Sequence, residues 1–136
     1  MKLKLILLAS VFALGFAFTA NAGSVVDTDT DLVPDAYDNC VDTANGPGET
    51  SNQVDSNLDG YGNACDTDYD NNGATTTADF TFFVDAFTGT PNPDTDADGN
   101  GATTTADFST FLNFFQSGAA PGPSGLACAG TIPCIP

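Results

Sequence analysis

A twelve-residue segment occurs twice in this chain of 136 residues, with the second copy 28 positions after the first. The copies cover residues 68–79 and 96–107. Both follow the pattern D-x-D-x-N-G-x5-D. This is the spacing of a calcium-binding loop, with oxygen-bearing side chains at positions 1, 3 and 5, glycine at position 6 and a carboxylate at position 12. The duplication indicates paired ion sites rather than a catalytic centre.

Each copy supplies a full set of oxygen ligands for a hard cation. In the first copy we expect calcium to be bound by Asp68, Asp70, Asn72, the Ala74 carbonyl, Thr76 and Asp79. In the second copy the equivalent ligands are Asp96, Asp98, Asn100, the Ala102 carbonyl, Thr104 and Asp107. The closing aspartate has a shorter arm than the glutamate of sensor loops, so the sequence leaves magnesium competition open.

An amphipathic helix is predicted after each loop, because apolar residues recur at i, i+3, i+4 and i+7. The two stripes are Phe80, Phe83, Val84 and Phe87, then Phe108, Phe111, Leu112 and Phe115. We expect them to pack together as a small aromatic core. Thr76 and Thr104 are the expected N-caps, and Gly89 and Gly118 the expected stops. Phe82 and Phe114 lie off the stripes, where partner contact and incidental surface packing are equally open.

The charge of the chain is very one-sided. All 18 acidic residues lie beyond residue 22, whereas the two lysines are Lys2 and Lys4 and there is no histidine. Two carboxylates about 4 Å apart repel by about 1 kcal/mol even in water. Crowded aspartates therefore need metal cations, or the chain stays disordered; the regular spacing of the acids and the 11 phenylalanines argue against disorder. Nucleic acid and anionic membranes are not expected as partners.

The first 22 residues have the features of a signal peptide. Lys2 and Lys4 precede an apolar stretch at residues 5–17, which is too short to span a bilayer. Ala20-Asn21-Ala22 fits a cleavage site, so the mature chain would start at Gly23, with no membrane insertion after cleavage. We therefore expect a secreted, extracellular protein, with the periplasm or the cell surface as alternatives.

Four cysteines suit an oxidising, exported compartment. Of the three pairings that they allow, we favour Cys40–Cys65 and Cys128–Cys134. In the chain-entropy model these disulfides are worth about 3.5 and about 2 kcal/mol. A zinc site is not expected, because the chain has no C-x2-C pair and no histidine.

The duplicated loop followed by a helix resembles the type I dockerin domain over residues 68–117. Dockerins fold as two calcium loop–helix units and bind cohesin modules on scaffold proteins. The resemblance implies a cohesin-like or other cell-surface or extracellular protein as the partner. Loop positions 10 and 11 contribute to cohesin recognition in that family, and here they are Thr77, Ala78, Thr105 and Ala106. The chain lacks the basic residues that dockerins often carry farther along their helices.

Two upstream segments, residues 27–40 and 55–66, resemble the thrombospondin type 3 motif. In that family the chain wraps around calcium ions with little regular structure, and disulfides tie successive motifs together. The ligands implied are Asp27, Asp29, Asp31, the Val33 carbonyl, Asp35 and Asp38, then Asp55, Asn57, Asp59, the Tyr61 carbonyl and Asp66. Leu32 stands where the motif has glycine. We expect it to strain or weaken the first site, since a branched residue resists positive φ.

These observations predict a small, mostly irregular plus α protein in four parts. They are a signal peptide (1–22), thrombospondin type 3-like calcium-binding loops (23–66), a dockerin-like pair of calcium loop–helix units (67–118) and a Gly/Pro-rich irregular tail with a disulfide loop (119–136). The predicted function is a secreted, calcium-binding, non-catalytic module for calcium-dependent protein–protein docking. The alternative is a calcium-stabilised structural spacer or an adhesion or matrix protein. No catalytic Cys–His pair or G-x-S-x-G is present.

Overall fold

The computed structural model describes residues 25–135, so the expected signal peptide lies outside the described residues. In this range there are two α-helices, α2 (Thr77–Phe87) and α3 (Thr105–Ser117), two short 3-10 helices, η1 (Asp35–Tyr37) and η2 (Pro93–Thr95), and no strand. This agrees with the expected small, mostly irregular plus α architecture. Neither α-helix has the length and apolar character needed to cross a membrane.

Both α-helices begin at the predicted threonine caps. The Thr76 hydroxyl accepts a hydrogen bond from the Ala78 amide, and the Thr76 amide donates to the Asp79 carboxylate at 2.7 Å. Thr104 and Asp107 repeat this capping box at the start of α3. The predicted stops also hold: α3 ends at Gly118, which is left-handed (φ 63°), and Gly89 (φ 121°) follows the C-cap of α2.

The two helices meet through aromatic rings, but only the centre of each stripe is buried. Phe83 and Phe111 are 3% and 1% exposed, with ring centroids 5.6 Å apart, and Tyr69 stacks on Phe111 at 6.1 Å. The outer stripe residues Phe80, Val84, Phe87 and Phe115 are exposed. The expected small aromatic core is therefore present at the centre of the two stripes, while their outer residues stay exposed. Two short helices bury only their line of contact, and among residues 25–135 no third helix covers the rest.

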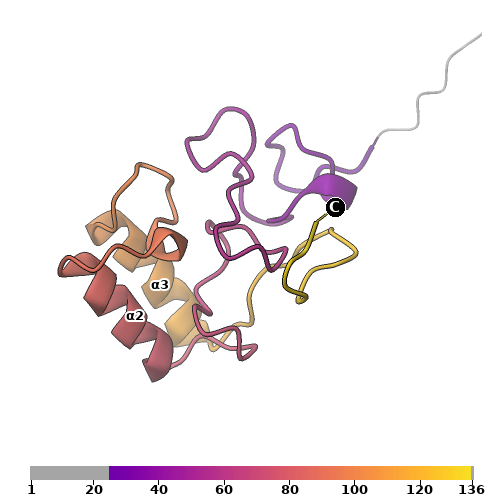
Figure 1. Ribbon diagram of the computed structural model, residues 1–136. Helices are drawn as coiled ribbons and strands as arrows, with labels where there is room; N and C mark the ends of the chain where they lie inside the picture. Colours follow the sequence, from indigo (N-terminus) through magenta and orange to yellow (C-terminus); the bar gives the residue numbers. More distant parts are fainter. Residues whose placement is uncertain (1–24, 136) are drawn as a thin grey trace, which may run out of the picture.

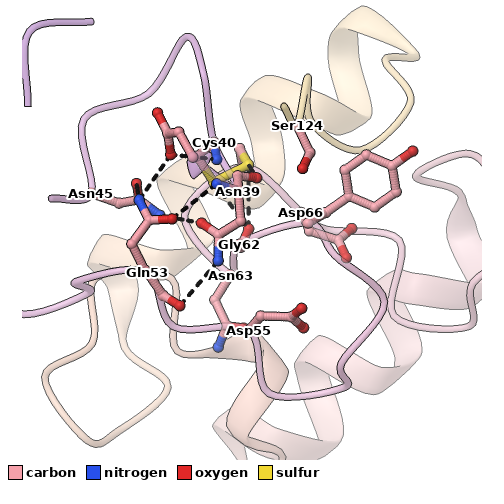
Figure 2. Close-up of a disulfide and its surroundings, with 12 residues drawn as sticks. Asn39, Cys40, Asn45, Gln53, Asp55, Gly62, Asn63, Asp66 and Ser124 are labelled. Atoms are coloured by element: carbon pink, nitrogen blue, oxygen red, sulfur yellow. Dashed lines mark hydrogen bonds between the residues drawn. A yellow bond between two sulfur atoms is a disulfide. The ribbon is translucent and has the colours of Figure 1, made fainter. Parts of the chain in front are cut away.

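The other half of the molecule winds irregularly around the Cys40–Cys65 disulfide (Figures 1 and 2). Both cysteines are fully buried, and Phe114 from α3 packs against the cluster that they form with Ala64. Phe114 thus lies at the junction of the helical pair and the irregular half, whereas Phe82 is exposed. The predicted pairing of the cysteines is confirmed for both disulfides.

Buried amides take the place of a hydrophobic core around this disulfide (Figure 2). The Asn39 backbone amide donates to Oε1 of Gln53 at 2.9 Å, and the Asn39 side chain donates to the Gln53 carbonyl at 3.0 Å. Gln53 Nε2 in turn donates to Asp38 at 2.8 Å. These hydrogen bonds link segments that are distant in the sequence, so the network fixes the arrangement of the loops around the disulfide.

The C-terminal segment is irregular, as expected, but it is bound along its length to the irregular half. The segment lies beside the earlier loops in Figure 1. Four of its amides donate to carbonyls there at 2.7–3.0 Å: Gly122 to Cys65, Gly125 to Asp38, Gly130 to Asp59 and Cys134 to Leu58. Residues 119–135 therefore belong to the same folded unit as the loops that they contact.

Candidate metal centres

Four twelve-residue segments share one loop geometry: loop 1 (27–38), loop 2 (55–66), loop 3 (68–79) and loop 4 (96–107). In each, the first aspartate accepts a hydrogen bond from the amide of the sixth residue, and that residue has a φ between 80° and 95°. The sixth residues are Leu32, Gly60, Gly73 and Gly101. The register found in the duplicated segment therefore extends to the two upstream loops, including the one that lacks glycine.

Loops 3 and 4 each bring three carboxylates together. Asp68, Asp70 and Asp79 offer oxygens within 4.8 Å of one another, and Asp96, Asp98 and Asp107 do the same. The closing aspartates are the most buried members, with Asp79 at 0% and Asp107 at 1% exposure. Like charges at this depth oppose each other unless a cation or a proton lies between them.

Hydrogen bonds hold each closing carboxylate in place. Asp79 Oδ1 accepts from the Asp70 amide at 3.2 Å, and its Oδ2 accepts from the amide and hydroxyl of Thr76. Asp107 makes the same contacts with Asp98 and Thr104. The threonines predicted as ligands thus orient the carboxylates in this structure. Asn72 and Asn100, the ligands predicted at position 5, are exposed.

Loop 1 contains buried carboxylate oxygens that no hydrogen-bond donor of the protein reaches. Asp27, Asp29 and Asp31 form a third trio within 4.8 Å. One buried oxygen of Asp27, one of Asp29 and one of Asp38 have no hydrogen-bond partner, and Asp38 is fully buried. Burial raises the pKa of Asp29, and the charges of Asp31, Asp38 and Asp27 add to this rise. Buried oxygens without donors are costly, and a cation bound by this set would satisfy them.

Asp35, another predicted ligand of loop 1, is not a member of the close trio. Both of its carboxylate oxygens accept hydrogen bonds from Thr28, each at 2.7 Å, so it stays a predicted ligand whose oxygens already have donors. The repeated spacing marks Asp35 as a ligand position, but it does not show whether a nearby amide and hydroxyl also bind its oxygens.

Loop 2 is more open. Among the described residues, its carboxylates Asp55, Asp59 and Asp66 do not form a trio as close as the other three. Asp55 accepts from the amides of Leu58 and Gly60, and Asn57 donates to Asn71 of loop 3 at 3.3 Å. Loop 2 therefore has its backbone in the shared geometry, with its side chains farther apart.

Asp94, in η2, was not predicted from the sequence as part of a site. Burial raises its pKa, and the charges of Asp55 and Asp59 raise it further. The segment around it is tied to loop 2, since the Asn63 side chain donates to the Pro93 carbonyl at 2.8 Å. Asp94 falls outside both repeated patterns, so no sequence signal could have indicated it.

The four backbone carbonyls predicted as ligands keep their lone pairs available. Within residues 25–135, the carbonyl oxygens of Val33, Tyr61, Ala74 and Ala102 accept no hydrogen bond from the protein. Each stands at position 7 of its loop, one residue after the positive-φ turn. Backbone carbonyls are normal calcium ligands at this loop position.

A pH dependence follows from Asp66. Burial raises its pKa to about 8, and the charges of Asp59, Asp68 and Asp94 add to the rise. The metal-free folded state therefore keeps a proton that the unfolded state releases near its ordinary pKa of 3.8. The contribution of Asp66 to metal-free stability is full below about pH 4 and is lost as the pH rises through about 8.

Calcium binding to a metal-free chain that is already folded at pH 7 should release close to one proton from this group, whereas binding to the expanded chain expected after chelation should release almost none from it, because Asp66 is ionised there. Calorimetry in two buffers of different ionisation enthalpy measures the release, and the difference between the wild type and Asp66→Asn gives the part that comes from this carboxyl group. Equal proton release by the wild type and Asp66→Asn would show that this carboxyl group is already ionised.

A second prediction concerns the glycine missing from loop 1. Leu32 holds a φ of 80° while its side chain is 79% exposed, so little burial offsets its backbone strain. Leu32→Gly should raise the calcium affinity of loop 1 by about fivefold, which corresponds to about 1 kcal/mol of relieved strain. Calorimetric titration measures this change.

Gly101→Ala is the matched control, because Gly101 has a φ of 94° and a Cβ there meets no atom within 4 Å. Gly101→Ala should lower the calcium affinity of loop 4 by about as much as Leu32→Gly raises that of loop 1. A Leu32→Gly variant with weaker binding than the wild type would contradict the strain argument.

The geometry defines a class: small disulfide-linked proteins whose acidic loops could hold cations. Within that class, the family model of the thrombospondin type 3 repeat matches residues 26–46 and 54–80. The second match runs through loop 3 and into the first turn of α2. Neither the curated proteins nor the solved structures contain a match to the chain. The thrombospondin type 3-like resemblance is therefore supported, while the dockerin-like resemblance stays a prediction.

Thrombospondin type 3 repeats are calcium-binding, and such repeats and disulfides are typical of extracellular proteins. The three acidic trios fit the same ion. The residues predicted to contact a partner, Thr77, Ala78, Thr105 and Ala106, are exposed on the first turns of α2 and α3.

Proposed function

We propose that this protein is an exported, non-catalytic structural module that calcium orders. The observation that carries the proposal is the convergence of unpartnered, buried carboxylate oxygens in loop 1, within a geometry that three further loops share. The match to thrombospondin type 3 repeats supports calcium as the ion. Calcium accepts six to eight oxygens in a flexible arrangement, whereas magnesium demands a tight octahedron, and the wide spacing in loop 2 favours the larger ion.

The non-catalytic part of the proposal rests on the side chains available. The chain has no histidine, and both of its lysines precede the expected cleavage site. General acid–base catalysis near neutral pH would have to use the carboxylates alone. Most of these already occupy ligand positions in the four loops. A spacer or matrix component needs no further chemistry.

Terbium luminescence tests the proposal directly, because Tyr69 lies between two ligands of loop 3 and Tyr61 lies within loop 2. Terbium is a luminescent substitute for calcium, and excitation of tyrosine should sensitise its emission. Calcium should displace it at far lower concentration than magnesium. Asp68→Asn should reduce the signal sharply, whereas Asp42→Asn, which removes the same charge outside the loops, should not. Absence of terbium emission on tyrosine excitation of the wild type would refute calcium binding at these loops.

Calcium-dependent docking to a cohesin-like or other extracellular protein is a second candidate function. It is supported by the exposure of Thr77, Ala78, Thr105 and Ala106 at the two helix starts. Surface plasmon resonance with an immobilised type I cohesin module should show binding only in calcium, and Ala78→Arg together with Ala106→Arg should abolish it. Absence of binding by the calcium-loaded wild type would leave the structural role alone.

A further inference from the structure

The outer parts of the aromatic stripes enclose an apolar groove between α2 and the start of α3. Its volume is about 280 Å³, and it is lined by Phe80, Phe83, Val84, Phe87, Thr105 and Phe108. Phe83 forms the floor at 3% exposure, whereas Phe80, Val84 and Phe87 form a rim that is 38–49% exposed. Apolar side chains gathered at the edge of one groove make it a candidate interaction site.

We propose that this groove binds a short amphipathic segment of another protein, one that presents apolar side chains flanked by lysine or arginine. The inference rests on the proposed function to the extent that calcium must order the helices. The groove shares only Thr105 with the predicted cohesin contacts, because its other lining residues belong to the aromatic stripes.

The size and chemistry of the groove argue for side chains as its occupants. Its volume is just below the range of roughly 300–1,000 Å³ that is usual for small-molecule sites, and its lining is aromatic and aliphatic except for Thr105. A small ligand would find few polar groups to fix its orientation. One or two apolar side chains of a peptide would instead be held by their own backbone.

The negative charge of the chain indicates which kind of segment could bind in the groove. Beyond Lys4 the chain has no side-chain cation and 18 acidic residues. Four divalent ions would supply eight positive charges and leave the surface strongly negative. Asp85 is exposed on α2 immediately after Val84 of the rim. Basic groups flanking the apolar side chains would be attracted to this surface, whereas an acidic segment would be repelled.

The same charge disfavours a second copy of this chain as the occupant, because each copy carries the same excess of negative charge. The groove is also small: a stable dimer usually buries about 800 Å² on each partner, whereas the rim exposes only parts of three side chains. A basic segment from a different protein satisfies both the charge and the size.

Calcium connects the groove to the loops. Thr105 lines the groove and directly follows Thr104, whose amide donates to the loop 4 carboxylate of Asp107 at 2.7 Å. Phe80 follows Asp79, the closing residue of loop 3. Loss of either ion would free a helix start that forms one wall, so peptide binding should require calcium.

Fluorescence anisotropy with a labelled peptide tests the inference. The probe is a peptide of about 18 residues in which leucine occupies one helical face and lysine the rest. It should bind the calcium-loaded protein saturably. Phe87→Ser should weaken binding by about tenfold or more, because it removes a rim side chain. Phe82→Ser is the matched control: Phe82 is 43% exposed on the same helix but does not line the groove, and its change should weaken binding by less than about twofold.

Four outcomes would overturn the inference. They are absence of binding by the wild type, equal effects of the Phe82 and Phe87 variants, equal binding of a peptide with glutamate in place of lysine, and a wild-type dimer in sedimentation velocity that Phe87→Ser dissociates. Terbium titration of the same samples separates the two proposals. A protein that binds terbium but not the peptide refutes the groove alone, whereas one that binds no terbium refutes the calcium module.

Discussion

Chelation of calcium should abolish most of the ordered structure of this protein, with the helical circular dichroism signal falling by more than half. Helices of 11 and 13 residues are marginal alone in water. Their capping boxes depend on Asp79 and Asp107, which are also the closing residues of loops 3 and 4. Without an ion, the buried carboxylates of these loops repel one another and must be protonated or exposed.

The size of the effect follows from linkage. Each site filled at about 100 times its dissociation constant adds about 2.7 kcal/mol to stability. Four such sites rival the whole unfolding free energy of a small domain, about 5–15 kcal/mol. Small-angle scattering should show expansion of the chelated chain, and excess calcium should reverse it. Sodium at equal ionic strength, which screens charge without filling the sites, is the control; an unchanged helical signal after chelation would contradict the expectation.

Removal of the Cys40–Cys65 disulfide should be the most damaging covalent change. The double variant Cys40→Ser, Cys65→Ser removes the cross-link from the unfolded chain. In the chain-entropy model the lost constraint lowers the free energy of unfolding by about 3.5 kcal/mol. It also places two hydroxyls in a buried cluster against which Phe114 packs. Thermal unfolding in saturating calcium should show a melting temperature lower by about 15 °C or more, at about 4–8 °C per kcal/mol for a chain of this size.

The Cys128→Ser, Cys134→Ser variant is the matched control, since its shorter loop is worth about 2 kcal/mol. Its melting temperature should fall by a smaller amount, although Cys134 is also buried and its amide donates a hydrogen bond to the Leu58 carbonyl. If the Cys128→Ser, Cys134→Ser variant had the lower melting temperature of the two, the Cys40–Cys65 cluster would not be the centre of the irregular half.

The local features of this fold could be predicted from the sequence because they repeat. Thr76 and Thr104 stand at the same place in two copies of one segment, and both cap a helix. The glycine position of the loops predicted a positive φ, and Leu32 adopts it against the preference of a branched side chain. In each case the controlling interactions lie within a dozen residues, where spacing in the sequence is also proximity in space.

The features that could not be predicted depend on contacts between distant segments. The amphipathic period marked Phe80 and Phe87 as apolar-face residues, but it could not tell that two helices would leave them uncovered. Nothing in the Gly/Pro-rich composition of the tail indicated that the Gly125 amide donates a hydrogen bond to the Asp38 carbonyl. The contact of Phe114 with the disulfide cluster likewise could not be predicted, because it depends on how the helical pair packs against the irregular half.

Asp35 and Asp94 show two further limits at the candidate metal centres. Asp35 fits the spacing of a ligand, but Thr28 binds both of its oxygens. Asp94 fits no pattern, but the fold places it where the charges of Asp55 and Asp59 act on it. A repeated spacing thus identifies the loops, while the final set of oxygens depends on which donors compete for them.

Native mass spectrometry of the purified chain in ample calcium tests the central claim most directly. The four loops predict four calcium ions bound to each folded chain, and Asp38→Asn should remove the ion of loop 1, whose buried oxygens lack donors. A folded chain that carries no bound metal under these conditions would contradict the account.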